Sequence, residues 1–173
     1  MSNGISLPWI AIPVAAICLL SLLAAPASAQ VNVEIGELSY LDRQYMSQQR
    51  SNLEDITRRH FGTGFNGEKA HDLELLQRIL DRGLVRSTQT AELQAMGMVL
   101  GDLLADELDM HWVVYEDRQG RSRALRYRDT DNYLFPVTMI SRRREAGNET
   151  SVEDIYQKAY DEIAPVRERL PFQ

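Results

Sequence analysis

The most regular hydrophobic pattern lies in residues 93–108, where apolar side chains recur at intervals of three and four. Two adjoining apolar rows run through this segment and predict a helix that is buried on most sides. The rows consist of Leu93, Met96, Leu100 and Leu104 and of Ala95, Val99 and Leu103. Gly97 and Gly101 share one face, where each costs about 1 kcal/mol of helix propensity relative to alanine. We therefore expect another element to approach them closely, with a ligand-facing backbone groove as the alternative.

Three amphipathic segments before this helix predict further helices. One covers residues 37–46, and a second begins at Ser51, which forms a capping-box pattern with Glu54, and ends near Arg59. A glycine-rich stretch then predicts a loop. The third helix covers residues 70–82, and its wide leucine stripe makes it the expected partner of the glycine face.

The hydrophobic period then changes from that of a helix to that of a strand. Residues 110–116 are rich in β-branched and aromatic side chains, residues 121–128 alternate, and residues 132–135 add a short third strand. Pro136 suits the first position of a helix, and Ser151 is the expected cap of a final one. The sequence therefore predicts an α+β fold with N-terminal helices, a small three-stranded antiparallel sheet and C-terminal helices.

The first 29 residues have the layout of a secretory signal peptide. Residues 14–25 form an uncharged apolar run that is shorter than the roughly 20 residues of a membrane span, and small residues precede the expected cleavage after Ala29. We expect export to the periplasm or outside the cell, and one folded domain at residues 30–173. No Lys or Arg precedes the apolar run, so an uncleaved anchor is the alternative. Cleavage would remove Cys18, the only cysteine, which excludes disulfides from the mature domain.

Arginine is concentrated in one part of the chain. The whole chain has a formal net charge of −6, yet residues 118–144 contain eight arginines and two acidic residues. Guanidinium groups favour two-pronged pairing with carboxylate or phosphate. Either this block contacts an envelope protein or anionic ligand through Arg126, Arg128 and Arg142, or it pairs with acidic helices of the same chain. Nucleic acid is not expected, because the chain is acidic and the block has few aromatic residues for stacking.

Residue patterns of known catalytic sites are sparse. The three histidines are too scattered for a helical metal pair, so we expect no metal and no cofactor. The serine-hydrolase pattern Gly-x-Ser-x-Gly does not occur in the sequence. The best enzymatic hypothesis is a small hydrolase with a carboxylate base, Asp102 or Asp72, beside Gln77 and Trp112. A solvated acid on the polar side of its helix is the simpler interpretation of Asp102.

Three segments together resemble a bacterial family of exported proteins. They are FGTGFNGEKAHDLELLQRILD, LQAMGMVLGDLLADELDMHWVVYEDRQGRSRALRYRD and FPVTMISRRREAGNE, and the similarity extends roughly over residues 53–164. The shared motifs are the Phe61-Gly62 pair, Asp72 with Leu76 and Gln77, the Gly97 and Gly101 spacing with Asp102, Trp112, Gly120, and residues 136–144. The family is classed as domain of unknown function 3806 and has no assigned reaction. The resemblance therefore implies an exported bacterial domain and no catalytic residue.

These observations favour a non-enzymatic binding or accessory domain of the cell envelope. Its expected contact surface is the edge of the sheet together with the arginine block. A small periplasmic hydrolase is the first alternative. An inhibitor or immunity-type protein, which would block a basic target with its acidic helices, is the second.

Overall fold

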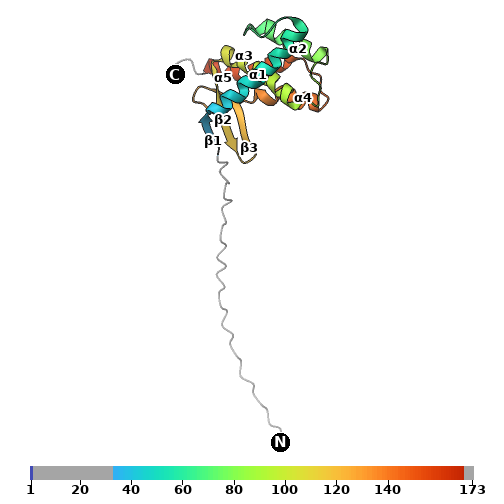
Figure 1. The fold of residues 1–173 in the computed structure, drawn as a ribbon. Helices are drawn as coiled ribbons and strands as arrows, with labels where there is room; N and C mark the ends of the chain where they lie inside the picture. The colour runs from blue at the N-terminus through green and yellow to red at the C-terminus, as the bar shows by residue number, and fades with distance from the viewer. Residues whose placement is uncertain (2–32, 170–173) are drawn as a thin grey trace. The chain divides into compact units, whose positions relative to one another are not determined.

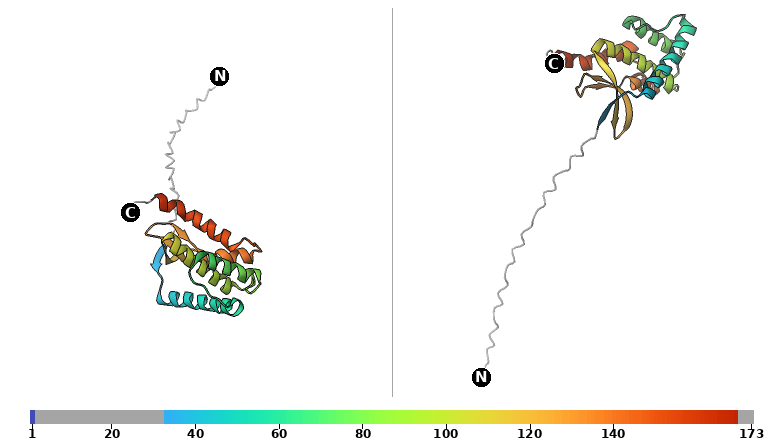
Figure 2. Two further views of the ribbon diagram at one scale, coloured as in Figure 1. Left: turned by 90° about the horizontal axis from the view of Figure 1, so that it is seen from above. Right: turned by 60° about the vertical axis from the view of Figure 1, so that its left-hand side comes forward.

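Helix α3 (Thr90–Leu108) lies at the centre of the fold. It packs against α1 (Tyr40–Phe61) and α5 (Val152–Arg169), and Figure 2 shows it between them. Eleven of its residues are buried, as its two adjoining apolar rows predict. The computed structural model describes Met1 and residues 33–169, so the rest of the predicted signal peptide lies outside the described residues.

The two glycines of α3 are sites of close approach, as predicted. A Cβ atom at Gly97 would lie 2.4 Å from the carbonyl oxygen of Pro136, and one at Gly101 would lie 2.5 Å from the ring of Trp112. The predicted partner, the helix at residues 70–82, was wrong, because the nearest atoms belong to the segment at Pro136 and to Trp112. That helix packs against α5 and α3 through its leucine stripe instead.

Helix α1 is continuous where the sequence predicted two helices. The Ser39 hydroxyl caps it by accepting a hydrogen bond from the Asp42 N–H at 3.1 Å, and Gly62 ends it in the left-handed conformation. The predicted start of a second helix at Ser51 was wrong. The polar stretch around Ser51 contains no glycine or proline, and as part of the mostly exposed face it interrupts the apolar row without interrupting the helix.

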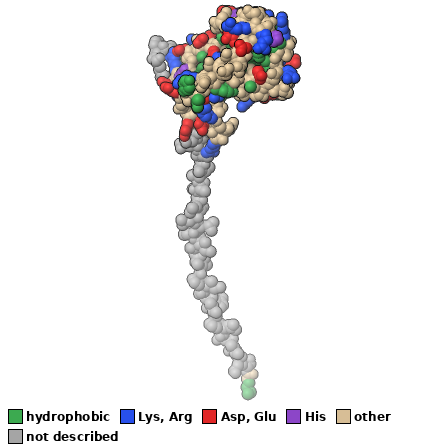
Figure 3. Space-filling view, in the orientation of Figure 1, with side chains coloured by type: hydrophobic (Ala, Val, Ile, Leu, Met, Phe, Trp, Pro, Cys, Tyr) green, Lys and Arg blue, Asp and Glu red, His purple; other side chains and the backbone are tan. Residues whose placement is uncertain are grey.

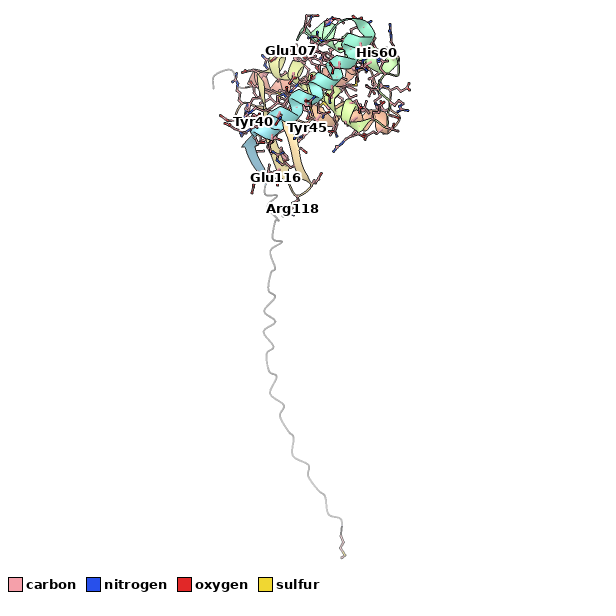
Figure 4. All side chains as sticks on the ribbon, viewed as in Figure 1. Tyr40, Tyr45, His60, Glu107, Glu116 and Arg118 are labelled. Atoms are coloured by element: carbon pink, nitrogen blue, oxygen red, sulfur yellow. The ribbon has the colours of Figure 1, made fainter. Side chains whose placement is uncertain are left out.

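The strands form one antiparallel sheet that packs on the helices. They are β1 (Glu34–Glu37), β2 (Met110–Asp117), β3 (Gly120–Tyr127) and β4 (Tyr133–Leu134), in the order β1-β2-β3-β4. Val114 of β2 packs with Met46 of α1 and Met98 of α3. The predicted number of three strands was wrong, because β1, with the sequence EIGE, has no strand pattern of its own. Glu116 and Arg118 mark the tip of the β2–β3 hairpin in Figure 4.

The remaining elements complete the core. They are α2 (Lys69–Asp81), the 3-10 turn η1 (Pro136–Thr138) and α4 (Met139–Glu145), and Figure 1 shows their arrangement around α3. Ser151 caps α5, as predicted, and α5 continues through Pro165. One hydrophobic core cluster draws residues from all five α-helices and from β2, β3 and β4. The predicted mixture of helices and sheet is therefore confirmed. No described helix is long and apolar enough to cross a membrane.

Candidate binding groove at the edge of the sheet

The outer edge of β3 is only partly covered by β4. Strand β4 has two residues and pairs with Leu125 and Arg126 of β3. It ends before Pro136, because proline has no N–H for the ladder and its fixed φ suits the start of a helical turn. The close contact with Gly97 then holds the chain against α3. Among the described residues, Gly120–Ala124 of β3 therefore have no strand partner on this side.

The alternation of main-chain hydrogen bonds shows which residues of β3 face this open edge. The Tyr127 N–H donates to the Asn132 carbonyl oxygen at 3.0 Å, on the β4 side of the strand. In an antiparallel strand, every second residue directs both of its main-chain groups to the same side. The N–H and C=O groups of Arg121 and Arg123 therefore point to the open edge, whereas those of Ser122 point to β2.

A groove lies between this open edge and the segment formed by η1 and α4. Two adjoining cavities of about 360 and 250 Å³ form the groove, and both are lined by Arg121, Ser122, Phe135 and Arg142. The larger cavity continues along the β2–β3 hairpin as far as Tyr115, and the smaller one extends to α3. The groove is thus long enough to follow several residues of β3.

Arg142 lies where three cavities meet. It is exposed on α4, and it also lines a third cavity of about 210 Å³. Among the side chains of residues 33–167, its guanidinium group has no hydrogen-bond or ion-pair partner. Phe135 lines the same three cavities, is 37% exposed, and makes an edge-to-face contact with Tyr115 at 5.2 Å between ring centroids. The groove therefore offers an available cation beside an aromatic surface.

Asp42 of α1 fixes two arginines of β3 at the same groove. Arg121 Nη2 lies 2.6 Å from its carboxylate and Arg123 Nη2 lies 2.9 Å from it. The hydrogen bonds from Arg121, with those from Ser39, hold the pKa of Asp42 well below its usual range. Arg121 and Arg123 were not among the site residues predicted from the sequence. Their alternation with Leu125 was the available signal, because it places all three side chains on one face of the strand.

Arg126 and Arg128, which the sequence predicted as contacts together with Arg142, are bound by their neighbours. Arg126 Nε donates to the Thr130 carbonyl oxygen at 2.8 Å. Arg128 Nε lies 3.6 Å from a carboxylate oxygen of Asp109. The structure therefore does not bring the three arginines into one patch: Arg142 lines the groove, and the other two engage groups close to them in the chain or sheet.

Asp102 and Trp112 are in contact, as the hydrolase hypothesis requires, but Arg50 binds the same carboxylate. Arg50 donates to both Asp102 oxygens, from Nε at 2.5 Å and from Nη2 at 2.7 Å, and Trp112 Nε1 donates at 2.9 Å. Both oxygens already accept N–H groups, which leaves Asp102 poorly placed to take a proton from a substrate. The cluster instead connects α1, α3 and β2.

The other two polar candidates also have partners within the fold. Gln77 Oε1 accepts from the Val152 N–H at 2.8 Å, at the start of α5. The oxygens of Asp72 accept from the N–H groups of Asn66 and Gly67 at 3.1 and 2.9 Å, in the loop before α2. In the part of the chain that the structure describes, no group of three or more His, Cys, Asp and Glu side chains could hold a metal ion.

One family model matches the part of the chain that forms the groove. Residues 72–156 match the family model "Domain of unknown function (DUF3806)". The resemblance to domain of unknown function 3806 is therefore confirmed over this range. The DUF3806 match includes α3, β2, β3, β4 and α4, and with them every residue that lines the two cavities along β3. Asp42 and Arg50, which contact this segment from α1, precede the match.

A solved structure from Bacteroides thetaiotaomicron VPI-5482 has a similar fold. It superposes with a TM-score of 0.68 at 19% sequence identity, over 79% of this chain and 51% of that chain. The present chain thus spans about half the length of that protein, and at this identity the similarity shows the fold alone. No curated protein matches the sequence.

Proposed function

We propose that the protein is a non-enzymatic binding domain that takes an anionic partner in the groove along β3. Arg142 is the observation that carries this proposal, because its guanidinium group lies at the junction of three cavities and no acid within residues 33–167 pairs with it. A guanidinium group pairs with a carboxylate through two parallel hydrogen bonds. Phe135 beside it supplies apolar contact area with little side-chain freedom to lose.

Arg142 is the cation of the groove that remains after its internal pairs are counted. Arg121 and Arg123 share the carboxylate of Asp42, and the Glu116 carboxylate opposite Arg121 also helps to raise the pKa of that arginine, so these two cations are balanced within the fold. Asp117 lines the larger cavity as well. Acidic and basic side chains are otherwise intermixed on the face shown in Figure 3, and the whole chain carries a net charge of −6. The preference for an anionic partner at the groove therefore rests on Arg142, which is exposed and has no ion-pair partner among the described side chains.

The hydrolase and inhibitor alternatives have less support. Arg50 and Trp112 already use the oxygens of Asp102, the proposed base of a hydrolase. An inhibitor of a basic target would use acidic helices, whereas the available charge in the groove is an arginine. A binding domain is therefore the function that the geometry supports best.

We further propose that this binding takes place outside the cytoplasm. The support is the signal-peptide layout of residues 1–29, with its apolar run and small residues before the expected cleavage site. N-terminal sequencing of the full chain, purified from the periplasmic fraction of a bacterial host, tests this proposal. We expect a mature protein that begins at Gln30, and recovery only from the cytoplasm with Met1 intact would contradict it.

Calorimetric titration with hexaglutamate, at low ionic strength where charge pairs are least screened, tests the anionic preference. Hexalysine is the ligand of opposite charge, and any binding of it to this acidic chain should not depend on Arg142. Arg142→Ala should weaken hexaglutamate binding by about 10–100-fold, because a hydrogen bond to a charged group contributes about 1.5–3 kcal/mol.

Arg59→Ala is the matched control for this titration. It removes the same charge from an exposed position near the end of α1, far along the chain from the groove residues. The affinity for hexaglutamate should then change by less than about threefold. Equal affinities of the wild type and Arg142→Ala would rule out the groove as the anion site.

A further inference from the structure

We infer that the anionic partner binds as an additional β-strand on the open edge of β3, beyond the end of β4. This inference rests on the proposed function, since it specifies how the groove holds its anionic ligand. The fitting ligand is an extended acidic peptide segment of another protein. Its main-chain amides would pair with β3, and one of its carboxylates would pair with Arg142.

The open edge supplies the main-chain hydrogen bonds for such a strand. The N–H and C=O groups of Arg121 and Arg123 point to this side, and β4 pairs only with Leu125 and Arg126. Unpaired main-chain groups at a sheet edge are a template for another strand, and strand addition is a recurrent mode of peptide binding. The segment Gly120–Ala124 is as long as a typical strand, so a short peptide can pair along it.

The charged side chains that normally protect a sheet edge are directed away from this one. Charged residues on an edge strand discourage pairing with other strands, and β3 carries arginines at 121 and 123. Both guanidinium groups bind Asp42 on the helix-facing side of the sheet. The Arg123 guanidinium also lies 4.5 Å from the ring of Tyr45, which Figure 4 labels on α1. These contacts leave the edge itself open toward the groove.

Charge decides between an acidic peptide and a second copy of the chain. If two β3 edges paired antiparallel around Ser122, Arg121 of one copy would lie opposite Arg123 of the other. Like charges on directly opposite residues destabilise a strand pair. An acidic residue in the added strand would instead meet the unpaired guanidinium group of Arg142. The edge therefore favours an acidic peptide as its occupant.

N-methylated peptides test the main-chain pairing. The parent probe is acetyl-Glu-Val-Glu-Val-Glu-amide, which combines negative charge with residues that suit a strand. In an extended peptide, alternate N–H groups face opposite sides. Methylating the nitrogens of either the Glu or the Val residues therefore removes one set of donors at constant charge. One methylated peptide should bind the full protein at least about tenfold more weakly than the parent, and the other within about threefold.

Amide hydrogen exchange, measured by NMR, gives an independent result on the protein side. In the free protein, the amides of Arg121 and Arg123 should exchange faster than those of Ser122 and Ala124, which face β2. Saturation with the parent peptide should slow exchange at Arg121 and Arg123 by about tenfold or more, because each N–H acquires an acceptor. Exchange at Ser122 should change little.

These measurements separate the inference from the proposed function. Equal weakening by both methylation patterns, or unchanged exchange at Arg121 and Arg123, overturns strand addition. So does a parent peptide that fails to bind. If hexaglutamate binding still depends on Arg142, the proposed function stands in each of these cases. Exchange at the two amides that slows with increasing protein concentration would place a second copy at the edge and also overturn the inference.

Discussion

Gly97→Ala should destabilise the protein although alanine favours a helix. The new Cβ atom would lie 2.4 Å from the Pro136 carbonyl oxygen and 2.6 Å from that of Val137. Both oxygens belong to the main chain of η1, so no side-chain rotation relieves the clash. Overpacking costs about 1–3 kcal/mol and occasionally more, whereas the exchange of glycine for alanine gains about 1 kcal/mol of helix propensity. With the clash at the upper end of this range, we expect a net loss of about 2 kcal/mol.

Urea unfolding followed by circular dichroism measures this loss, and the thermal midpoint should fall by about 4–8 °C. Gly36→Ala is the control, because a Cβ atom at Gly36 meets nothing within 4 Å and its φ is not positive. Its free energy of unfolding should equal or slightly exceed that of the wild type. If Gly97→Ala is as stable as this control, the claim that η1 rests directly on the backbone of α3 is refuted.

Three further substitutions test individual contacts. Asp42→Asn should cost about 1–3 kcal/mol near neutral pH, because it weakens charge-assisted bonds to two arginines. Folding lowers the pKa of Asp42, so the carboxylate stabilises the protein above its unfolded-state pKa of about 3.9, and this stability is lost as the pH falls below that value. The urea midpoints of wild type and variant should therefore converge in acid, and a constant difference would contradict this assignment. Tyr156→Phe should raise the pKa of Glu107 in an NMR titration, because the Tyr156 hydroxyl donates the hydrogen bond that contributes most to lowering it; an unchanged pKa would exclude this contact. Gln77→Leu should cost about 1–3 kcal/mol in thermal unfolding, because the Val152 N–H loses its acceptor; wild-type stability would show that water replaces the side chain.

The hydrophobic pattern was sufficient to predict α3, β2 and β3, because their burial depends on a period that is visible in the sequence. It did not identify the element that covers Gly97 and Gly101. Either the leucine stripe of α2 or the segment at Pro136 could approach these glycines closely. Only the path of the chain after β4 decides between them. Strand β1 was missed because EIGE forms a strand through its pairing with β2 rather than through its own propensity.

The sequence predicted only part of the groove, because the pairing of its side chains depends on the path of the chain. Local composition located the arginine block that contains Arg142, but it does not show which arginines find partners. Arg126 and Arg128 belong to the same block, and the structure gives them neighbours near the β3–β4 turn. Arg121 and Phe135 border the groove only because β4 is short, and strand length is among the least certain features of a sequence-based prediction.

The two-residue length of β4 has a consequence for other proteins that share this fold. In the register set by the Leu125–Leu134 pair, three more extended residues before Pro136 would let β4 pair with Arg123 and Arg121, and β4 would then cover this edge of the sheet. The number of residues between the preceding turn and this proline therefore sets how far β4 can extend along β3. We expect proteins of this fold with few residues before the proline to leave the edge of β3 open to a peptide. Those with more residues there should cover the edge with their own β4.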